Sequence, residues 1–142
     1  MRNGFTLLEL LVVLVLAGIL ADLGLRPALR QLDRWAVLSA REEVASLVAI
    51  ARVRAVGTVG ATLALDEVTG SVEVHSAVWP DTIVRFGERH GVALEIVGSA
   101  QTVMLRFNAL GLGQVASRRL RFVRGKASAD LVLSSHGRLR RQ

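Results

Sequence analysis

Residues 1–25 read MRNGFTLLELLVVLVLAGILADLGL, and this stretch decides how the fold begins. From Phe5 to Leu25 only Thr6, Glu9 and Asp22 interrupt an apolar run. At roughly 1.5 Å per residue, a helix of this length rises about 31 Å, which is enough to cross the hydrocarbon core of a bilayer. The sequence therefore predicts a membrane-spanning helix at the start of the chain.

Glu9 is the residue of this segment that requires an explanation. On insertion scales, an acidic side chain near the middle of a membrane helix costs about 2.5–3.5 kcal/mol, and less near an end. Such residues are functional candidates, because they need a compensating partner. The simplest partner is a positive one, and an amine from a neighbouring copy of the same helix would supply it.

A cleaved secretory signal is the alternative interpretation of this segment. Arg2 would supply the basic start, and residues 19–21 (Ile-Leu-Ala) would supply a passable cleavage site near Ala21. Glu9 argues against this alternative, because a carboxylate at the entrance of the apolar core weakens membrane insertion and contributes nothing to export. The carboxylate thus favours a segment that remains attached to the chain.

The six residues from Gly4 to Glu9 (GFTLLE) closely resemble the class III signal of type IV pilins and type II secretion pseudopilins. The resemblance implies that a prepilin peptidase cuts after Gly4 and that the new terminal residue, Phe5, is N-methylated. It implies further that Glu9 pairs with the N-terminal amine of an adjacent subunit during filament assembly. The resemblance thus implies a positive partner for Glu9, which the cost of placing a carboxylate in the membrane also requires.

The same resemblance divides the chain into three parts. Residues 1–4 are expected to be a leader peptide, residues 5–25 a transmembrane and assembly helix, and residues 26–142 a periplasmic pilin-like domain. The protein is then expected in the inner membrane as a single-pass protein with its carboxyl-terminal domain in the periplasm, and in an assembled filament. Asp22 and Arg26, four positions apart, are expected to pair on one helix face.

The helix is predicted to continue without a break into the second part, to about Val56. No glycine or proline occurs between Ala28 and Val56, whereas Pro27 is a possible kink because it removes a backbone hydrogen bond. Apolar residues recur along one face at steps of seven, four, three and four. That face, which should pack on a sheet, consists of Val37, Val44, Val48, Ala51 and Ala55.

Beyond Gly57 the sequence changes to short β-rich runs separated by turn residues. A hairpin is predicted around residues 67–70, and the runs recur about every ten residues, which favours an antiparallel arrangement. The fold class expected is therefore α+β, with a helix over 26–56 and a β-rich part over 57–142. The predicted strands are Thr62–Asp66, Ser71–His75, Thr82–Phe86, Val92–Val97, Thr102–Asn108, Arg118–Val123 and Ala129–Ser135.

The β-rich part resembles one smaller group within the pilins and pseudopilins. A long β-rich domain with a segment such as LRFNALGLG (Leu105–Gly113) is similar to the GspH/FimT group of minor pseudopilins. This resemblance implies a minor subunit of a type II secretion or type IV pilus-like filament that contributes to pseudopilus assembly and protein secretion. The implied partners are other pseudopilins or pilins, prepilin peptidase, the inner-membrane platform of the secretion or pilus system, and the inner membrane itself.

Charge is distributed unevenly along the chain. Residues 1–100 carry nine Lys and Arg against eleven Asp and Glu, whereas residues 101–142 carry nine against one. A basic half suggests an anionic partner such as nucleic acid or lipid headgroups, although a solvated basic face is an equally simple explanation. The chain ends in HGRLRRQ, where Arg138, Arg140 and Arg141 are candidates for bidentate phosphate contacts.

The segment Gly137–Arg140 also matches a Gly-Arg-x-Arg pattern of FimT-type minor pilins that bind DNA during natural transformation. DNA capture by these arginines is thus an alternative function, and duplex backbone contacts are favoured because aromatic stacking residues are scarce. The competing explanation is that the Gly-Arg segment is a strand that packs on the sheet. Both explanations remain open from the sequence.

No catalytic constellation is evident, and the chain is not expected to be an enzyme. The three histidines, His75, His90 and His136, have no metal-ligand spacing, so no metal or other cofactor is expected. His75 and His90 are interpreted as surface or strand-end residues. The chain contains no cysteine, which excludes disulfides and thiolate chemistry.

Overall fold

The computed structural model describes residues 6–98, 101–114 and 117–142. The chain divides into two units: the first ends at Leu32, and the second comprises Asp33–Gln142. The long helix α1 (Leu7–Ala55) contributes to both units and is assigned without a break through Pro27. Its limits confirm the predicted helix to within two residues at each end.

Within the second unit, α1 packs through one face on the sheets. The stripe predicted from the sequence is buried throughout, from Val37 to Ala55. Leu47, Ala40 and Ala45 widen this face. Alanine and valine make up most of this buried face.

The first sheet has the strand order β3-β2-β1-β5, and all its neighbours are antiparallel. The predicted hairpin is confirmed, because Asp66 pairs with Ser71 at its closed end. Alternate residues of β1 are buried, as expected for a sheet with one face on a core. The strands are β1 (Ala61–Asp66), β2 (Ser71–Ser76), β3 (Thr82–Arg85) and β5 (Thr102–Phe107).

The second sheet has the strand order β4-β6-β7-β8 and is antiparallel as well. Leu120 and Phe122 of β6 point to the core, whereas Arg119 and Arg121 point away from it. Arg119 and Arg121 therefore share the outer face of β6. The strands are β4 (Ala93–Val97), β6 (Arg118–Arg124), β7 (Ala127–Leu133) and β8 (Leu139–Arg141).

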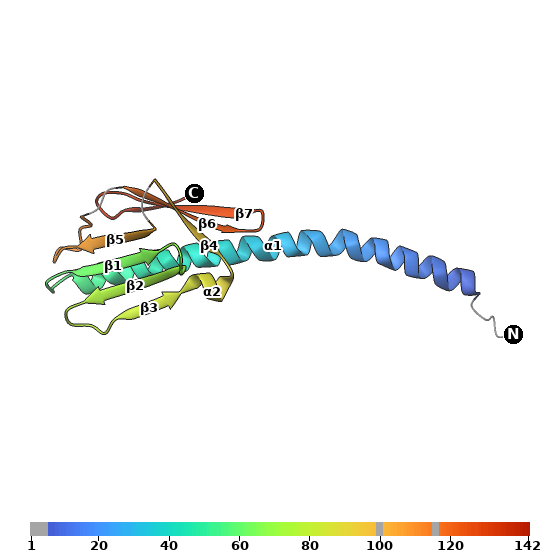
Figure 1. Ribbon diagram of the computed structural model, residues 1–142, viewed down its shortest axis with the longest axis horizontal. Helices are drawn as coiled ribbons and strands as arrows, with labels where there is room; N and C mark the ends of the chain where they lie inside the picture. Colours follow the sequence, from blue (N-terminus) through green and yellow to red (C-terminus); the bar gives the residue numbers. More distant parts are fainter. Residues whose placement is uncertain (1–5, 99–100, 115–116) are drawn as a thin grey trace. The chain divides into compact units, whose positions relative to one another are not determined.

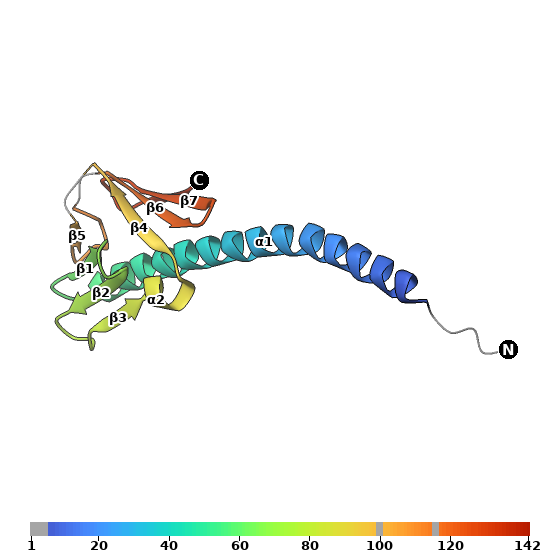
Figure 2. The ribbon, with the colours of Figure 1, turned by 45° about the vertical axis from the view of Figure 1, so that its right-hand side comes forward.

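Both sheets lie against the second half of α1 and share one core with it (Figures 1 and 2). The core includes Leu63 and Leu65 of the first sheet and Leu131 and Leu133 of the second. The α+β class with a long helix on antiparallel sheets, predicted from the sequence, is therefore confirmed.

Two elements were not predicted. Phe86 does not end a strand but starts a short helix, α2 (Phe86–His90), which Gly91 closes in a left-handed conformation. Phe86 is fully buried, and its ring meets that of Phe122 edge-to-face at 5.7 Å between centroids. The other is β8, which is not among the predicted strands, although a strand in the Gly-Arg segment is one of the two explanations left open above.

Candidate functional sites at the N-terminal segment and the C-terminal arginines

The described part of the N-terminal motif begins at Thr6, so Gly4 and Phe5 lie outside the described residues. The hydroxyl of Thr6 accepts a hydrogen bond from the backbone N–H of Glu9 at 3.2 Å, and the carbonyl of Thr6 accepts from Leu10 at 3.2 Å. Thr6 therefore caps α1, and its spacing from Glu9 is that of a capping box. This capping contact of Thr6 was not predicted from the sequence, although the Thr-x-x-Glu spacing is its signal.

Glu9 lies in the first turn of α1, where a negative charge interacts favourably with the helix dipole. Its side chain is exposed, and no basic side chain of residues 6–98, 101–114 or 117–142 pairs with it. The carboxylate is thus available to a positive group from another molecule.

The apolar residues of the first unit are exposed from Leu7 to Leu32. The helix that contains them, α1, is long and apolar enough to cross a membrane, with a mean hydropathy of 2.4 over its most apolar window. Near the end of the segment, Arg26 Nε lies 3.0 Å from Asp22 Oδ1, which confirms the predicted pair. Trp35 is exposed in the second unit.

The structure separates the three C-terminal arginines. Arg141 turns toward α1, where its Nε lies 2.9 Å from Glu42 Oε2. Arg140 is exposed, and Arg138 is exposed in the turn that precedes β8. In the described part of the chain, no acidic side chain pairs with Arg138 or Arg140.

Arg140 joins a basic row on the outer face of the second sheet. The register places Val132 between Arg119 of β6 and Arg140 of β8. Arg121, two residues along β6, is bound to Asp130, with Arg121 Nε 3.0 Å from Asp130 Oδ1. Arg119 lies farther from the same carboxylate, at 3.9 Å. Arg119 and Arg140 are therefore exposed basic groups of this face, and Arg138 is exposed in the turn that precedes β8, whereas Arg121 and Arg141 form ion pairs with Asp130 and Glu42.

The glycine of the Gly-Arg segment has a packing function. Gly137 is buried with φ at 77°, and a Cβ on it would lie 2.8 Å from Arg52 Nη2 and 3.2 Å from Phe107 Cε1. Arg52 donates a hydrogen bond to the Gly137 carbonyl, while its Nε is buried without a partner in the described residues. Gly113 also abuts Gly137, since a Cβ on Gly113 would lie 3.0 Å from Gly137 N. The packing explanation of Gly137 is thus supported.

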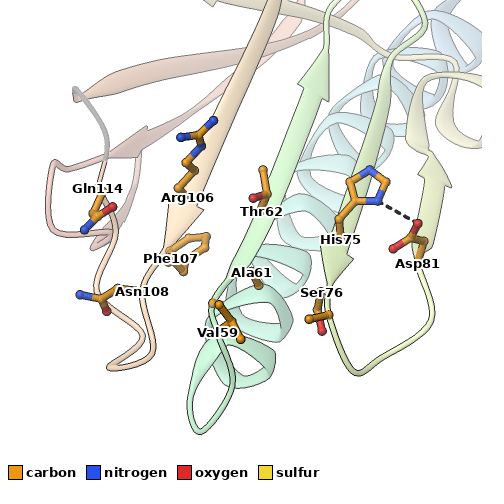
Figure 3. A pocket seen from close by; sticks show the side chains of 12 residues that line it. Val59, Ala61, Thr62, His75, Ser76, Asp81, Arg106, Phe107, Asn108 and Gln114 are labelled. Carbon is orange, nitrogen blue, oxygen red and sulfur yellow. Dashed lines mark ion pairs between the residues drawn. The ribbon is translucent and has the colours of Figure 1, made fainter.

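A hollow of about 730 Å³ lies on the outer side of the first sheet (Figure 3). His75 Nδ1 lies 2.9 Å from Asp81 Oδ2, and His75 Nε2 lies 3.2 Å from Glu73 Oε2. The hydrogen bond to Asp81 raises the pKa of His75, and the one to Glu73 adds to it. Arg106 lies across Thr62 from His75 (Figure 3). Both nitrogens of the His75 imidazole are thus bound to carboxylates. These contacts hold the β2–β3 loop on β2, and neither nitrogen is directed at a nucleophile.

The other histidines are also accounted for by local contacts. His90 ends α2, and its Nε2 lies 3.0 Å from Glu43 Oε2 on α1. His136 is exposed and bonded to Ser135. Within the described residues, no three histidine or acidic side chains are grouped to hold a metal ion.

A profile described as the prokaryotic N-terminal methylation motif matches residues 1–21. A crystal structure of the type IV minor pilin FimU of Pseudomonas aeruginosa (strain PAO1), in space group P21, superimposes with a TM-score of 0.59. The match covers 75% of this chain and 87% of that one, at 17% identity. The chain has a prepilin-type N terminus and a minor-pilin fold.

The same minor pilin in space group P65 superimposes with a TM-score of 0.55 at 18% identity, over 74% of this chain and 91% of that one. No curated protein matches the sequence. The minor-pilin fold is thus preserved in this chain at an identity too low for individual residues to be equated.

Proposed function

We propose that this chain is a minor pseudopilin of the GspH/FimT type, a structural subunit of a type II secretion or type IV pilus-like filament. It would contribute to pseudopilus assembly and protein secretion without catalytic activity of its own. The observation that carries the proposal is the N-terminal motif in front of an apolar helical segment, residues 7–32, whose apolar side chains are exposed.

The proposed sequence of events follows from the motif. Prepilin peptidase cleaves after Gly4, and the amine of Phe5 is methylated. Residues 5–25 hold the chain in the inner membrane with its globular domain in the periplasm, until the inner-membrane platform moves it into the filament. There Glu9, exposed and without a basic partner in the described chain, pairs with the N-terminal amine of the adjacent pilin subunit.

The proposal is tested at two separate steps. Replacing Gly4 by a bulky residue is expected to accumulate unprocessed precursor, which immunoblots of membranes would show. Glu9→Gln is expected to leave cleavage intact and to abolish incorporation into filaments. The hydrogen bond to Thr6 comes from the backbone N–H of residue 9, and glutamine suits this position as well as glutamate does, so this variant removes the charge without removing the helix start. Normal incorporation of Glu9→Gln would contradict the pairing.

DNA capture for natural transformation is the second candidate function. It is favoured by three exposed arginines: Arg138 and Arg140, which pair with no acidic side chain in the described residues, and Arg119, whose Nε lies 3.9 Å from Asp130 Oδ2. Exposed arginines suit contacts to a duplex backbone, and each phosphate neutralised changes the salt slope of log affinity by about 0.9. Arg141 is expected to contribute less, because Glu42 already binds it.

Titration of the full chain, in a nonionic detergent, with duplex DNA at two salt concentrations tests this candidate. Combined replacement of Arg119, Arg138 and Arg140 by alanine should lower the salt slope by about 2–3. Arg141→Ala is the matched control and should lower it by less than about 1. Absence of salt-sensitive binding by the unmodified chain would leave the arginines as a solvated surface.

A further inference from the structure

Three loop segments without any charged residue surround the carboxyl end of α1. They comprise residues 56–60 (VGTVG), 77–80 (AVWP) and 109–113 (ALGLG), in a chain of which 21% is charged. Large apolar side chains are exposed on all three loops and on the last turns of α1. We call this surface the apolar collar; it consists of Val53, Val56, Val59, Val78, Trp79, Leu110 and Leu112.

Hydrogen bonds and close packing join the three loops to one another and to the helix. The N–H of Gly57 donates to the carbonyl of Ala109, and Arg54 Nη1 donates to the carbonyl of Pro80 at 3.1 Å. Gly111 approaches the helix so closely that a Cβ on it would lie 3.0 Å from Arg52 Cγ. The collar is therefore one continuous surface fixed on α1, and its apolar side chains are not on independent loop tips.

The collar is concave beside Trp79. A hollow of about 480 Å³ is lined there by Ala49, Ile50, Val53, Val56 and Trp79, with Arg54 at its rim. Its lining is predominantly apolar, and Arg54 is held by the Pro80 carbonyl. A hollow of this kind accommodates a protruding apolar side chain of another molecule.

The collar is large enough for a stable contact. Its seven side chains are each about half exposed or more, so the apolar area is on the order of several hundred Å², at the size that marks interaction sites on monomers. With the surrounding loop backbone this approaches the roughly 800 Å² that each partner contributes to a standard interface.

We infer that the apolar collar binds a folded domain of a neighbouring filament subunit, through a surface of that domain that is apolar and uncharged. A protein is favoured over a lipid bilayer for two reasons. The loops contain no Lys or Arg to meet anionic headgroups, and a concave hollow fits a side chain better than a membrane surface. The inference rests on the proposed filament function and adds a contact surface to it.

Site-specific crosslinking tests the inference in cells that assemble the filament. The chain has no cysteine, so Val53→Cys and Val68→Cys each provide one attachment point for a photoreactive maleimide. The two valines are 73% and 72% exposed, but Val68 lies in the β1–β2 turn, outside the collar. Val53→Cys should crosslink to one filament subunit, identified by mass spectrometry, and Val68→Cys should not. Crosslinks of Val53→Cys to lipid alone, or equal yields from both positions, would overturn the inference.

A matched charge substitution provides the functional readout. Val53→Glu should reduce incorporation into filaments about tenfold, the effect of one central interface residue, whereas Val68→Glu should change it less than about twofold. Both variants should be cleaved by prepilin peptidase and should unfold at the same temperature as the unmodified chain. Equal incorporation of both would overturn the collar contact.

Different results would contradict the proposed filament function and the proposed collar contact. If the unmodified chain is neither processed nor incorporated into filaments, the proposed filament function is wrong, and so is the collar contact that rests on it. If the unmodified chain and the Glu9→Gln variant behave as proposed but Val53→Glu is incorporated normally, only the collar inference is wrong.

Discussion

Glu42 and Arg141 are 99 positions apart in the sequence, yet Arg141 Nε lies 2.9 Å from Glu42 Oε2. Arg41, next to Glu42, also donates to the carbonyl of Gln142 at 3.3 Å. Together these contacts tie the last strand to the first helix. The consequence for function is that Arg141 stabilises the fold, whereas Arg138 and Arg140 remain exposed.

The Glu42–Arg141 pair should make stability depend on pH in the acid range. Burial alone would raise the pKa of Glu42, but hydrogen bonds from Arg41 and Arg141 outweigh it and lower the pKa below its ordinary value of 4.5. A lowered pKa stabilises the fold above about pH 4.5, and this stabilisation is lost as pH falls through the folded value. Because the pair is exposed, Glu42→Gln should cost about 0.5 kcal/mol at neutral pH.

Urea unfolding of the full chain in a nonionic detergent would measure this cost at about pH 7 and about pH 3. The difference between the unmodified chain and Glu42→Gln should shrink at the lower pH. A difference that is the same at both values would show that the carboxylate charge contributes nothing.

Much of the fold could be predicted because the signals were local. The steps of three, four and seven from Val37 to Ala55 identify a helix face without knowledge of the partner sheet. The turn signal at residues 67–70 fixes the β1–β2 register. By contrast, FGERH (Phe86–His90) is too short to show a helical period, and its helix depends on the contact of Phe86 with Phe122, 36 residues later in the chain.

The site was predictable to a lesser extent, for the same reason. The GFTLLE motif is contiguous, so the sequence alone indicated its residues. Whether an arginine is paired depends on residues elsewhere in the chain: Arg141 pairs with Glu42, and Arg121 pairs with Asp130. The apolar collar is formed by three loops that are far apart in the sequence, so no local sequence pattern predicts it.

The aromatic pair should hold α2 on the second sheet. Phe86 and Phe122 are fully buried and meet at an interplanar angle of 67°. Phe122→Ala should cost about 3–5 kcal/mol, much of the stability of a domain of this size. Phe86→Leu, Phe122→Leu and the double variant would retain the fold, and a double-mutant cycle by urea unfolding should give a coupling of about 0.5–1.5 kcal/mol. Additive effects would mean that the rings do not interact specifically.

Gly137 should not tolerate alanine. Alanine there would combine an unfavourable positive φ with a Cβ 2.8 Å from Arg52 Nη2. Gly57 is the matched control, because its φ of 75° is nearly the same and nothing lies within 4 Å of its Cβ position. Gly57→Ala should cost about 1–2 kcal/mol from the backbone alone, and Gly137→Ala at least about 1 kcal/mol more. Equal costs in urea unfolding would show that Arg52 moves aside freely.

His75 should give the fold a second pH dependence, which begins near its ordinary pKa of 6.5 and extends to higher pH. Hydrogen bonds to Asp81 and then to Glu73 raise its pKa from the ordinary 6.5. A raised pKa stabilises the fold fully below about pH 6.5, and this stabilisation is lost as pH rises through the folded value. His75→Gln should therefore destabilise more at about pH 6 than at about pH 9, by less than about 1 kcal/mol because these contacts are half-exposed. Titration of the His75 ring by NMR checks the cause: Asp81→Asn should lower its pKa, and an unchanged pKa would show that Asp81 does not hold the imidazolium.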